Sequence, residues 1–207
     1  MTTGTDLLAL SPVMPVVVID DVDDAVPTAR ALHAGGIGVI ELTLRTPVAL
    51  TAIERVAAEV PDIVVGAGTV TSPEQAKQAA EAGAKFLVTP GTTDAVLDAA
   101  FATGLPFLPG ASTVSEAMRL AERGLSALKF FPAEASGGAA FLKSIAGPLP
   151  QLQFCPTGGI TVSSAREYLA LPNVGCIGGS WLTPSKLLAA KDFAAVEKLA
   201  AEAAALR

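Results

Sequence analysis

The sequence predicts an α/β fold consisting of a single (β/α)8 TIM barrel, and three observations support this prediction. Short apolar runs alternate with longer amphipathic segments along the chain. The apolar runs are almost continuously hydrophobic, which is typical of parallel strands covered on both faces. Eight strand–helix pairs follow one another with no linker between them, as a barrel of this kind requires. With 207 residues, 51% of them hydrophobic, the chain is expected to form one domain over residues 1–207.

The expected strands are short, and helices are expected between them. The strands are Val13–Ile19, Gly38–Leu42, Ile63–Val65, Phe86–Val88, Phe107–Leu108, Ala127–Phe130, Leu152–Cys155 and Val174–Ile177. One helix is capped by Ser72, has Pro73 in its first turn and ends at Gly83. The same pattern recurs where Ser112 and Thr113 precede a helix that ends before Gly124.

A doubly wound open sheet is the alternative architecture. A dinucleotide-binding fingerprint would favour it, but the segment Gly66-Ala67-Gly68-Thr69 lacks the third glycine at the required position. The barrel is therefore preferred. Because the chain is shorter than the roughly 250 residues typical of this fold, its loops are expected to be tight.

Composition excludes several classes of partner. The net charge is −6 and no basic cluster is present, so neither nucleic acid nor a membrane surface is an expected partner. The segment Met1–Asp6 has no basic region of the secretory type, and a cytoplasmic protein is expected. Cys155 and Cys176 are interpreted as buried thiols. The single histidine, His33, is interpreted as a cation near a helix C-terminus, so no metal and no cofactor are expected.

Lys129 is the residue most suggestive of chemistry. It lies in the apolar run Ala127–Phe130, where burial disfavours its charged form. A neutral amine can attack a carbonyl carbon. Glu41, near the end of the second strand, is either an ion-pair partner of Arg45 or a proton shuttle for imine formation. A reactive lysine favours the second interpretation.

The other candidate residues follow the C-terminal ends of the expected strands, which meet at one mouth in a barrel. Arg45 suits a planar carboxylate, and Thr69 can add a hydroxyl donor to it. Gly158-Gly159 and Gly178-Gly179-Ser180 follow strands seven and eight, where barrels commonly bind phosphate. The alternative is that these glycines serve tight turns that need positive φ.

With these residues in place, the chain resembles the 2-keto-3-deoxy-6-phosphogluconate (KDPG) aldolases, which often also act as 4-hydroxy-2-oxoglutarate (KHG) aldolases. Two signatures carry the resemblance, Gly36–Arg45 and Gly124–Gly137. Three further stretches support it, namely Val65–Val70, Cys155–Ile160 and Cys176–Trp181.

The resemblance implies a class I aldolase barrel, usually a homotrimer, that needs no metal. It implies that Lys129 forms the Schiff base and that Glu41 moves protons. The implied ligands of the substrate are Arg45 and Thr69 for its carboxylate, Pro90 and Phe131 as pocket walls, Thr157 near its hydroxylated carbons, and Gly158, Gly159, Gly179 and Ser180 around its phosphate.

The implied reaction cleaves a phosphorylated 2-keto acid, KDPG, to pyruvate and glyceraldehyde 3-phosphate. Two alternatives use the same lysine, 4-hydroxy-2-oxoglutarate cleavage and oxaloacetate decarboxylation. A third, from another class, is a non-catalytic phosphosugar-binding barrel or a phosphosugar isomerase. The chain departs from its relatives after the first strand, where they often carry a basic side chain and this sequence has Asp20, Asp21, Asp23 and Asp24. A weaker preference for phosphorylated substrates is therefore expected.

Overall fold

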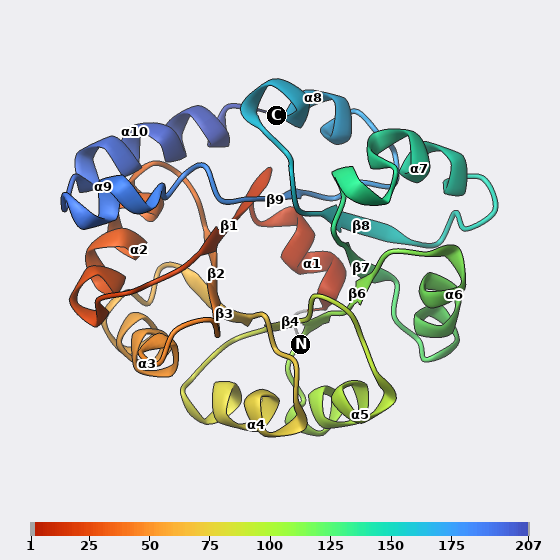
Figure 1. Ribbon diagram of the computed structural model, residues 1–207, viewed down its shortest axis with the longest axis horizontal. Helices are drawn as coiled ribbons and strands as arrows, with labels where there is room; N and C mark the ends of the chain where they lie inside the picture. Colours follow the sequence, from red (N-terminus) through yellow and green to blue (C-terminus); the bar gives the residue numbers. More distant parts are fainter. Residues whose placement is uncertain (1–2, 207) are drawn as a thin grey trace.

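Parallel strands form the inner layer of the molecule and helices surround them, as Figure 1 shows. The structure is a computed structural model that describes residues 3–206, so Met1, Thr2 and Arg207 of the predicted domain lie outside the described residues. One sheet has six strands in the order β5-β4-β3-β2-β1-β9, and the other has three in the order β6-β7-β8. All of the strand pairs in both sheets are parallel. The predicted parallel α/β class is thus confirmed.

The strands overlap all eight predicted runs: two have the predicted bounds, β5 and β7, and the other six have shifted ends. They are β1 (Val13–Val17), β2 (Val39–Thr43), β3 (Val64–Gly68), β4 (Leu87–Val88), β5 (Phe107–Leu108), β6 (Gly110–Ala111), β7 (Ala127–Phe130), β8 (Gln153–Pro156) and β9 (Ile177–Gly179). The ninth strand, β6, was not predicted. It is separated from β5 by Pro109, which has no amide proton to donate to a ladder. The Pro109 carbonyl accepts a hydrogen bond from the Lys129 amide at 2.9 Å.

Two glycine segments predicted to follow strands lie inside them, which corrects their placement. Gly66 and Gly68 belong to β3, and Gly178 and Gly179 belong to β9. The reason is packing, because a Cβ at Gly178 would overlap the Thr157 hydroxyl and a Cβ at Gly179 would overlap the Trp181 ring. The missing side chains leave room for these neighbours, so the alternative interpretation of Gly178 and Gly179 as turn residues is wrong.

Helices cover the outer face of the strands. They are α2 (Ala25–Ala34), α3 (Ala49–Glu59), α4 (Pro73–Glu81), α5 (Asp94–Thr103), α6 (Val114–Glu122), α7 (Gly138–Ile145), α8 (Val162–Leu169), α9 (Ser185–Ala189) and α10 (Phe193–Ala204), with short 3-10 turns η1 (Val22–Asp24) and η2 (Glu134–Ser136). The caps follow the prediction: Ser72 accepts from the Gln75 amide, and Thr113 caps α6. His33 lies in the last turn of α2, as predicted.

A further helix, α1 (Gly4–Ala9), was not predicted. It begins with a capping box between Thr3 and Asp6 and packs against β7 and β8 (Figure 1 shows it in red among the strands). Its Leu7 and Leu8 join an inner apolar cluster that also includes Met14, Val39, Phe86, Val88, Leu108, Ala127, Cys155 and Cys176. Both cysteines are buried, as predicted. A larger cluster fills the layer between strands and helices.

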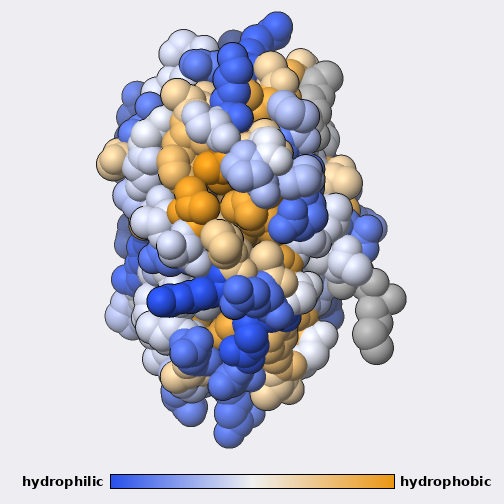
Figure 2. All heavy atoms as spheres, turned by 90° about the vertical axis from the view of Figure 1, so that its right-hand side faces the viewer, coloured by the Kyte–Doolittle hydropathy of each residue, from blue (hydrophilic) through white to orange (hydrophobic). Residues whose placement is uncertain are grey.

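The surface combines charged regions with an apolar area. Figure 2 shows this apolar area on one side of the molecule, with hydrophilic side chains around it. The exposed large hydrophobic side chains of the described residues are Leu10, Val18, Phe101, Val114, Met118 and Val162. Across residues 3–206, no helix is both long enough and apolar enough to cross a membrane.

Candidate active site

A buried lysine and a buried glutamate meet between the two sheets. The Lys129 Nζ atom, from β7, donates a hydrogen bond to Glu41 Oε1, from β2, at 3.2 Å. Lys129 is 4% exposed and Glu41 is 1% exposed. Away from water the attraction between opposite charges is much stronger than at a surface. A proton transferred from Nζ to Oε1 would leave a neutral amine, which is a nucleophile, beside a neutral acid.

The strands fix both side chains in register. Lys129 is paired with Gly110 on β6 and Cys155 on β8, while Glu41 is paired with Gly66 on β3. A Cβ at Gly68 would overlap the Glu41 carboxylate, so the glycine provides the space in which that carboxylate lies. Among the described residues the ion-pair partner of Glu41 is Lys129. The alternative interpretation of Glu41, a structural pair with Arg45, is therefore wrong.

Arg45 and Thr69 form a second pair at the ends of β2 and β3. The Arg45 Nε atom donates to Thr69 Oγ1 at 3.1 Å, and Arg45 is exposed. Thr69 has φ 58°, in the left-handed region that a β-branched residue rarely adopts. This unusual backbone directs a threonine hydroxyl toward the arginine. The pair presents a planar guanidinium and a hydroxyl, the groups that suit a carboxylate.

Phe131 and Thr157 lie around the lysine. Lys129 Nζ is 5.5 Å from the centre of the Phe131 ring, within range of a cation–π interaction. A Cβ at Gly158 would come within 3.3 Å of the same ring. Thr157 is buried, and it forms a bridge with Gly178 that links the end of β8 to β9. The structure thus brings Lys129, Glu41, Phe131, Thr157 and Gly158 to one region.

The turn at Gly158 and Gly159 exposes amide groups. Their φ values are 103° and 81°, so the interpretation of these two glycines as turn residues is confirmed. Among the described residues, the amides of Gly158, Gly159 and Ile160 donate to no protein acceptor. The turn leads into α8, whose N-terminus adds favourable partial charge for an anion. Both properties suit phosphate binding.

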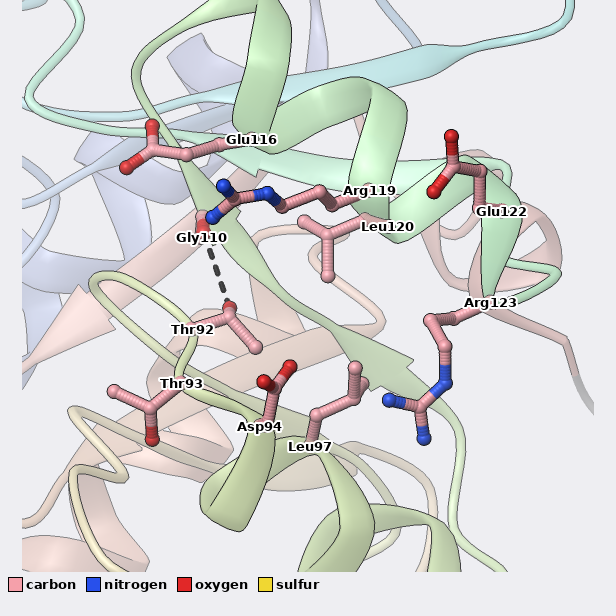
Figure 3. Close-up of a pocket in the computed structure, with 10 residues that line it drawn as sticks. All are labelled: Thr92, Thr93, Asp94, Leu97, Gly110, Glu116, Arg119, Leu120, Glu122 and Arg123. Atoms are coloured by element: carbon pink, nitrogen blue, oxygen red, sulfur yellow. Dashed lines mark hydrogen bonds between the residues drawn. The ribbon is translucent and has the colours of Figure 1, made fainter.

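Pro90 contacts β6, the strand that pairs with the Lys129 strand β7. A Cβ at Gly110 would overlap the Pro90 backbone, and the Gly110 amide donates to Thr89 Oγ1 at 2.9 Å. Thr92 Oγ1 donates to the Gly110 carbonyl at 3.0 Å, which Figure 3 shows as a dashed line. These contacts hold the loop after β4 against the strand that pairs with Lys129. Sequence reasoning missed Gly68 and Gly110, because their importance depends on neighbours from distant segments.

A cavity of about 470 Å³ lies between α5 and α6. Figure 3 shows the residues that line it. It is lined by helix side chains that include Asp94, Arg119 and Arg123, and it does not include Lys129 or Glu41. A second cavity, of about 280 Å³, lies between Asp20, Asp21 and Asp24 on one side and Ser185 and Lys191 on the other. Within residues 3–206 no group of three or more histidine, cysteine, aspartate or glutamate side chains is placed to hold a metal ion.

A parallel α/β fold with a buried lysine–carboxylate pair is typical of enzymes in which a lysine attacks the carbonyl carbon of a substrate. The chain belongs to the KDPG and KHG aldolase family, whose model matches residues 5–199. It is 51% identical over 202 residues to the "KHG/KDPG aldolase" of Escherichia coli strain K12, covering 98% of this chain and 95% of that protein. The recognised resemblance is therefore confirmed.

Two solved structures share the fold. A Legionella pneumophila KDPG aldolase, with pyruvate captured as a covalent carbinolamine intermediate, has a TM-score of 0.96 and 45% identity over 99% of both chains. A Zymomonas mobilis KDPG aldolase with 3-phosphoglycerate has a TM-score of 0.94 and 47% identity, covering 100% of this chain and 97% of that chain.

Proposed function

We propose that the protein is a Schiff-base (class I) aldolase that cleaves 2-dehydro-3-deoxy-6-phosphogluconate (KDPG) to pyruvate and D-glyceraldehyde 3-phosphate. The observation that carries the proposal is the buried Lys129–Glu41 pair, with 3.2 Å between Nζ and Oε1. The Legionella pneumophila enzyme with its covalent pyruvate carbinolamine supports the same chemistry.

The reaction begins when Glu41 accepts a proton from Lys129. The neutral Nζ attacks the C2 ketone to form a carbinolamine. Glu41 then returns its proton to the carbinolamine hydroxyl, which leaves as water, so that an iminium ion and the Glu41 carboxylate remain. Glu41 then takes the proton of the C4 hydroxyl as the C3–C4 bond breaks, and the electron pair of that bond moves to the iminium to form an enamine. Glyceraldehyde 3-phosphate leaves, C3 is protonated, and water releases pyruvate and the free amine.

The remaining site residues bind and orient the substrate in this proposal. Arg45 and Thr69 bind the carboxylate of the pyruvyl part. Pro90 and Phe131 shape the walls, and Thr157 contacts the hydroxylated carbons. The phosphate is bound by backbone amides of Gly158 and Gly159, together with Gly179 and Ser180; the Zymomonas mobilis structure with 3-phosphoglycerate supports a phosphorylated ligand.

Reduction with borohydride tests the proposal. In the presence of pyruvate, borohydride should inactivate the enzyme and add the mass of a reduced pyruvyl group at Lys129, as measured by peptide mass spectrometry. Treatment without pyruvate is the control. A fully active protein with no adduct on Lys129 contradicts the proposal.

A second candidate function is cleavage of 4-hydroxy-2-oxoglutarate to pyruvate and glyoxylate, or decarboxylation of oxaloacetate. The printed name of the Escherichia coli relative, which includes KHG, favours the first of these. All of these reactions pass through the same pyruvyl enamine, so only the ratio of kcat/KM values for the substrates distinguishes them. A phosphosugar-binding barrel or a phosphosugar isomerase is a third candidate. It requires that Lys129→Ala keep full ligand binding in the first case, or full isomerase activity in the second.

A complete (β/α)8 barrel formed by one domain over residues 1–207 is also part of the proposal. It is supported by the bridges Phe154–Val174 and Thr157–Gly178, which join the two sheets on one side, and by the single residue between β5 and β6 on the other. Deletion of α10 should then destabilise the whole chain, and the shortened protein should melt in one transition when followed by circular dichroism. Independent melting of two parts would contradict a single domain.

We further propose a homotrimer in the cytoplasm that acts in the Entner–Doudoroff pathway. The apolar area in Figure 2 supports association, because exposed apolar patches of this kind mark protein–protein contacts. Light scattering after size-exclusion chromatography should give three times the 20.8 kDa mass of the chain. A monomeric mass at micromolar concentration contradicts the trimer.

A further inference from the structure

Glu134 and Tyr168 form a contact between an exposed carboxylate and a buried phenol that the proposed mechanism does not use. Tyr168, on α8, is 1% exposed, and its hydroxyl donates to Glu134 Oε1 at 2.7 Å. Burial, and then the Glu134 carboxylate, raise the pKa of Tyr168 far above its usual range, so the phenol stays a donor. Gly138 leaves room for the pair, because a Cβ there would lie 3.3 Å from the Tyr168 hydroxyl.

Glu134 also contacts the Gly158–Gly159 turn, through its backbone and its side chain. Its amide donates to the Gly158 carbonyl at 3.1 Å, and the neighbouring Ala133 amide donates to the Thr157 carbonyl at 2.8 Å. A Cβ at Gly159 would lie 2.6 Å from Glu134 Cγ, so the glutamate side chain fills the space beside that glycine. The turn is therefore held by the segment that follows β7.

That segment begins at Phe131, two residues after the proposed lysine nucleophile. Lys129 and Glu134 are five residues apart, and both are tied to β8 or the turn after it. The position of Glu134 thus determines how far the free amides of the turn lie from Lys129 Nζ. A substrate that is bonded to Lys129 at one end and carries an anionic group at the other can reach both sites only if this distance matches its own length.

We propose that Glu134 and Tyr168 are positioning residues that hold the Gly158–Gly159 turn in place and thereby set the preference of the enzyme for phosphorylated over unphosphorylated 2-keto acids. The inference rests on the proposed aldolase function. The two residues do not touch the reacting carbons, so their removal affects binding of the phosphate and leaves formation of the Schiff base intact.

The test compares kcat/KM for KDPG and for unphosphorylated 2-keto-3-deoxygluconate. Tyr168→Phe should lower the ratio of the two values about tenfold, as expected for loss of one hydrogen bond to a charged group. The change should appear in KM for KDPG, while the rate of pyruvate trapping by borohydride at Lys129 stays the same. Ser144→Ala on α7 is the matched control, because within residues 3–206 the hydroxyl that it removes donates to the Ala140 carbonyl alone.

An unchanged ratio overturns the inference, whether kcat/KM falls equally with both substrates or with neither. If Tyr168→Phe does not fold, Glu134→Gln replaces it, because the neutral amide still accepts from the phenol but more weakly, and the ratio should fall about threefold. An unchanged ratio in that variant also overturns the inference. Failure of the wild-type enzyme to form the pyruvyl adduct at Lys129 refutes the aldolase function itself, whatever the ratio.

Discussion

Lys129 and Glu41 are 88 residues apart in the sequence, and the Nζ atom of one lies 3.2 Å from the Oε1 atom of the other. Glu41 belongs to the six-stranded sheet and Lys129 to the three-stranded sheet. The pair therefore exists only when both sheets have formed and face one another. Its chemistry and its contribution to stability can be separated by substitution.

Lys129→Met should abolish aldol cleavage and also destabilise the fold. It leaves the Glu41 carboxylate buried without its partner, which costs about 3 kcal/mol. The double variant Lys129→Met/Glu41→Leu should regain most of that stability but no activity, because both charges are then gone. Urea unfolding and a coupled pyruvate assay measure the two effects. Equal stability of the single and double variants would contradict a buried ion pair.

Gly68→Ala should reduce activity without removing any functional group. The added methyl group would overlap the Glu41 carboxylate and displace it from Lys129 Nζ. We expect kcat to fall by about a hundredfold, since small misplacements of catalytic groups have large effects. Gly147→Ala is a suitable control, because a Cβ there meets nothing within 4 Å. An unchanged kcat in Gly68→Ala would show that the Glu41 carboxylate can be displaced without loss of catalytic rate.

Substitutions of Thr69 should distinguish its contribution to carboxylate binding from the cost of its strained backbone. Thr69→Gly removes the hydroxyl that Arg45 contacts, and it also relieves a left-handed conformation that costs about 1 kcal/mol for a threonine. KM for the substrate should rise while the melting temperature stays equal or increases. Thr69→Ser restores the hydroxyl and should restore KM. A lower melting temperature together with normal KM in Thr69→Gly is the opposite of this expectation.

The negative charge of Asp20 should weaken the preference of the wild-type enzyme for phosphorylated substrates. It follows β1, whose residues pair in register with β9, and it lines a cavity together with Asp21, Ser185 and Lys191. Asp20→Lys replaces a repulsive charge near the mouth, so kcat/KM for KDPG should rise about threefold at low salt and less at high salt. The value for the unphosphorylated substrate should not change. The same increase with both substrates would exclude an effect on the phosphate.

Glu116 should contribute a pH-dependent share of stability. The hydrogen bond from the Ser112 amide is the main cause that lowers the pKa of Glu116 below its ordinary value of 4.5. Burial opposes this effect, and the hydrogen bonds from Thr113 add to it. Because the pKa of Glu116 is lower in the folded protein than in the unfolded chain, its carboxylate stabilises the fold above pH 4.5. This stabilisation is lost as the pH falls through the pKa of Glu116 in the folded protein. Glu116→Ala should therefore be less stable than wild type by about 1 kcal/mol at pH 7. The gap should narrow as the pH falls below 4.5, and a constant gap would indicate another cause.

Local sequence signals were sufficient to predict much of this fold. Ser72, Pro73 and Thr113 marked helix starts correctly because capping depends on neighbours within one turn. The division of the fifth strand at Pro109 and the placement of Gly178 inside β9 were not predicted. Both depend on which distant segment lies alongside, and periodicity does not carry that information.

The candidate site shows the same limit. Lys129 could be singled out because a charge in an apolar run is unusual wherever the run lies. The partner of Glu41 could not be chosen from sequence, since Arg45 is near in the chain and Lys129 is near only in space. Glu134 lay within a quoted signature, but its contact with Tyr168 joins two segments 34 residues apart.

Helix α1 has a consequence for the order of events at Lys129. Its Leu7 and Leu8 pack with Ala127 in the inner cluster, two residues before the lysine on β7, and so close the strands at that end. Substrate and products must then share the opposite opening, where the Gly158–Gly159 turn lies. In the proposed mechanism the aldehyde departs first, because pyruvate is then still bonded to Lys129 as the enamine. Since α1 closes the other end of the strands, both products depend on the same exit, one after the other.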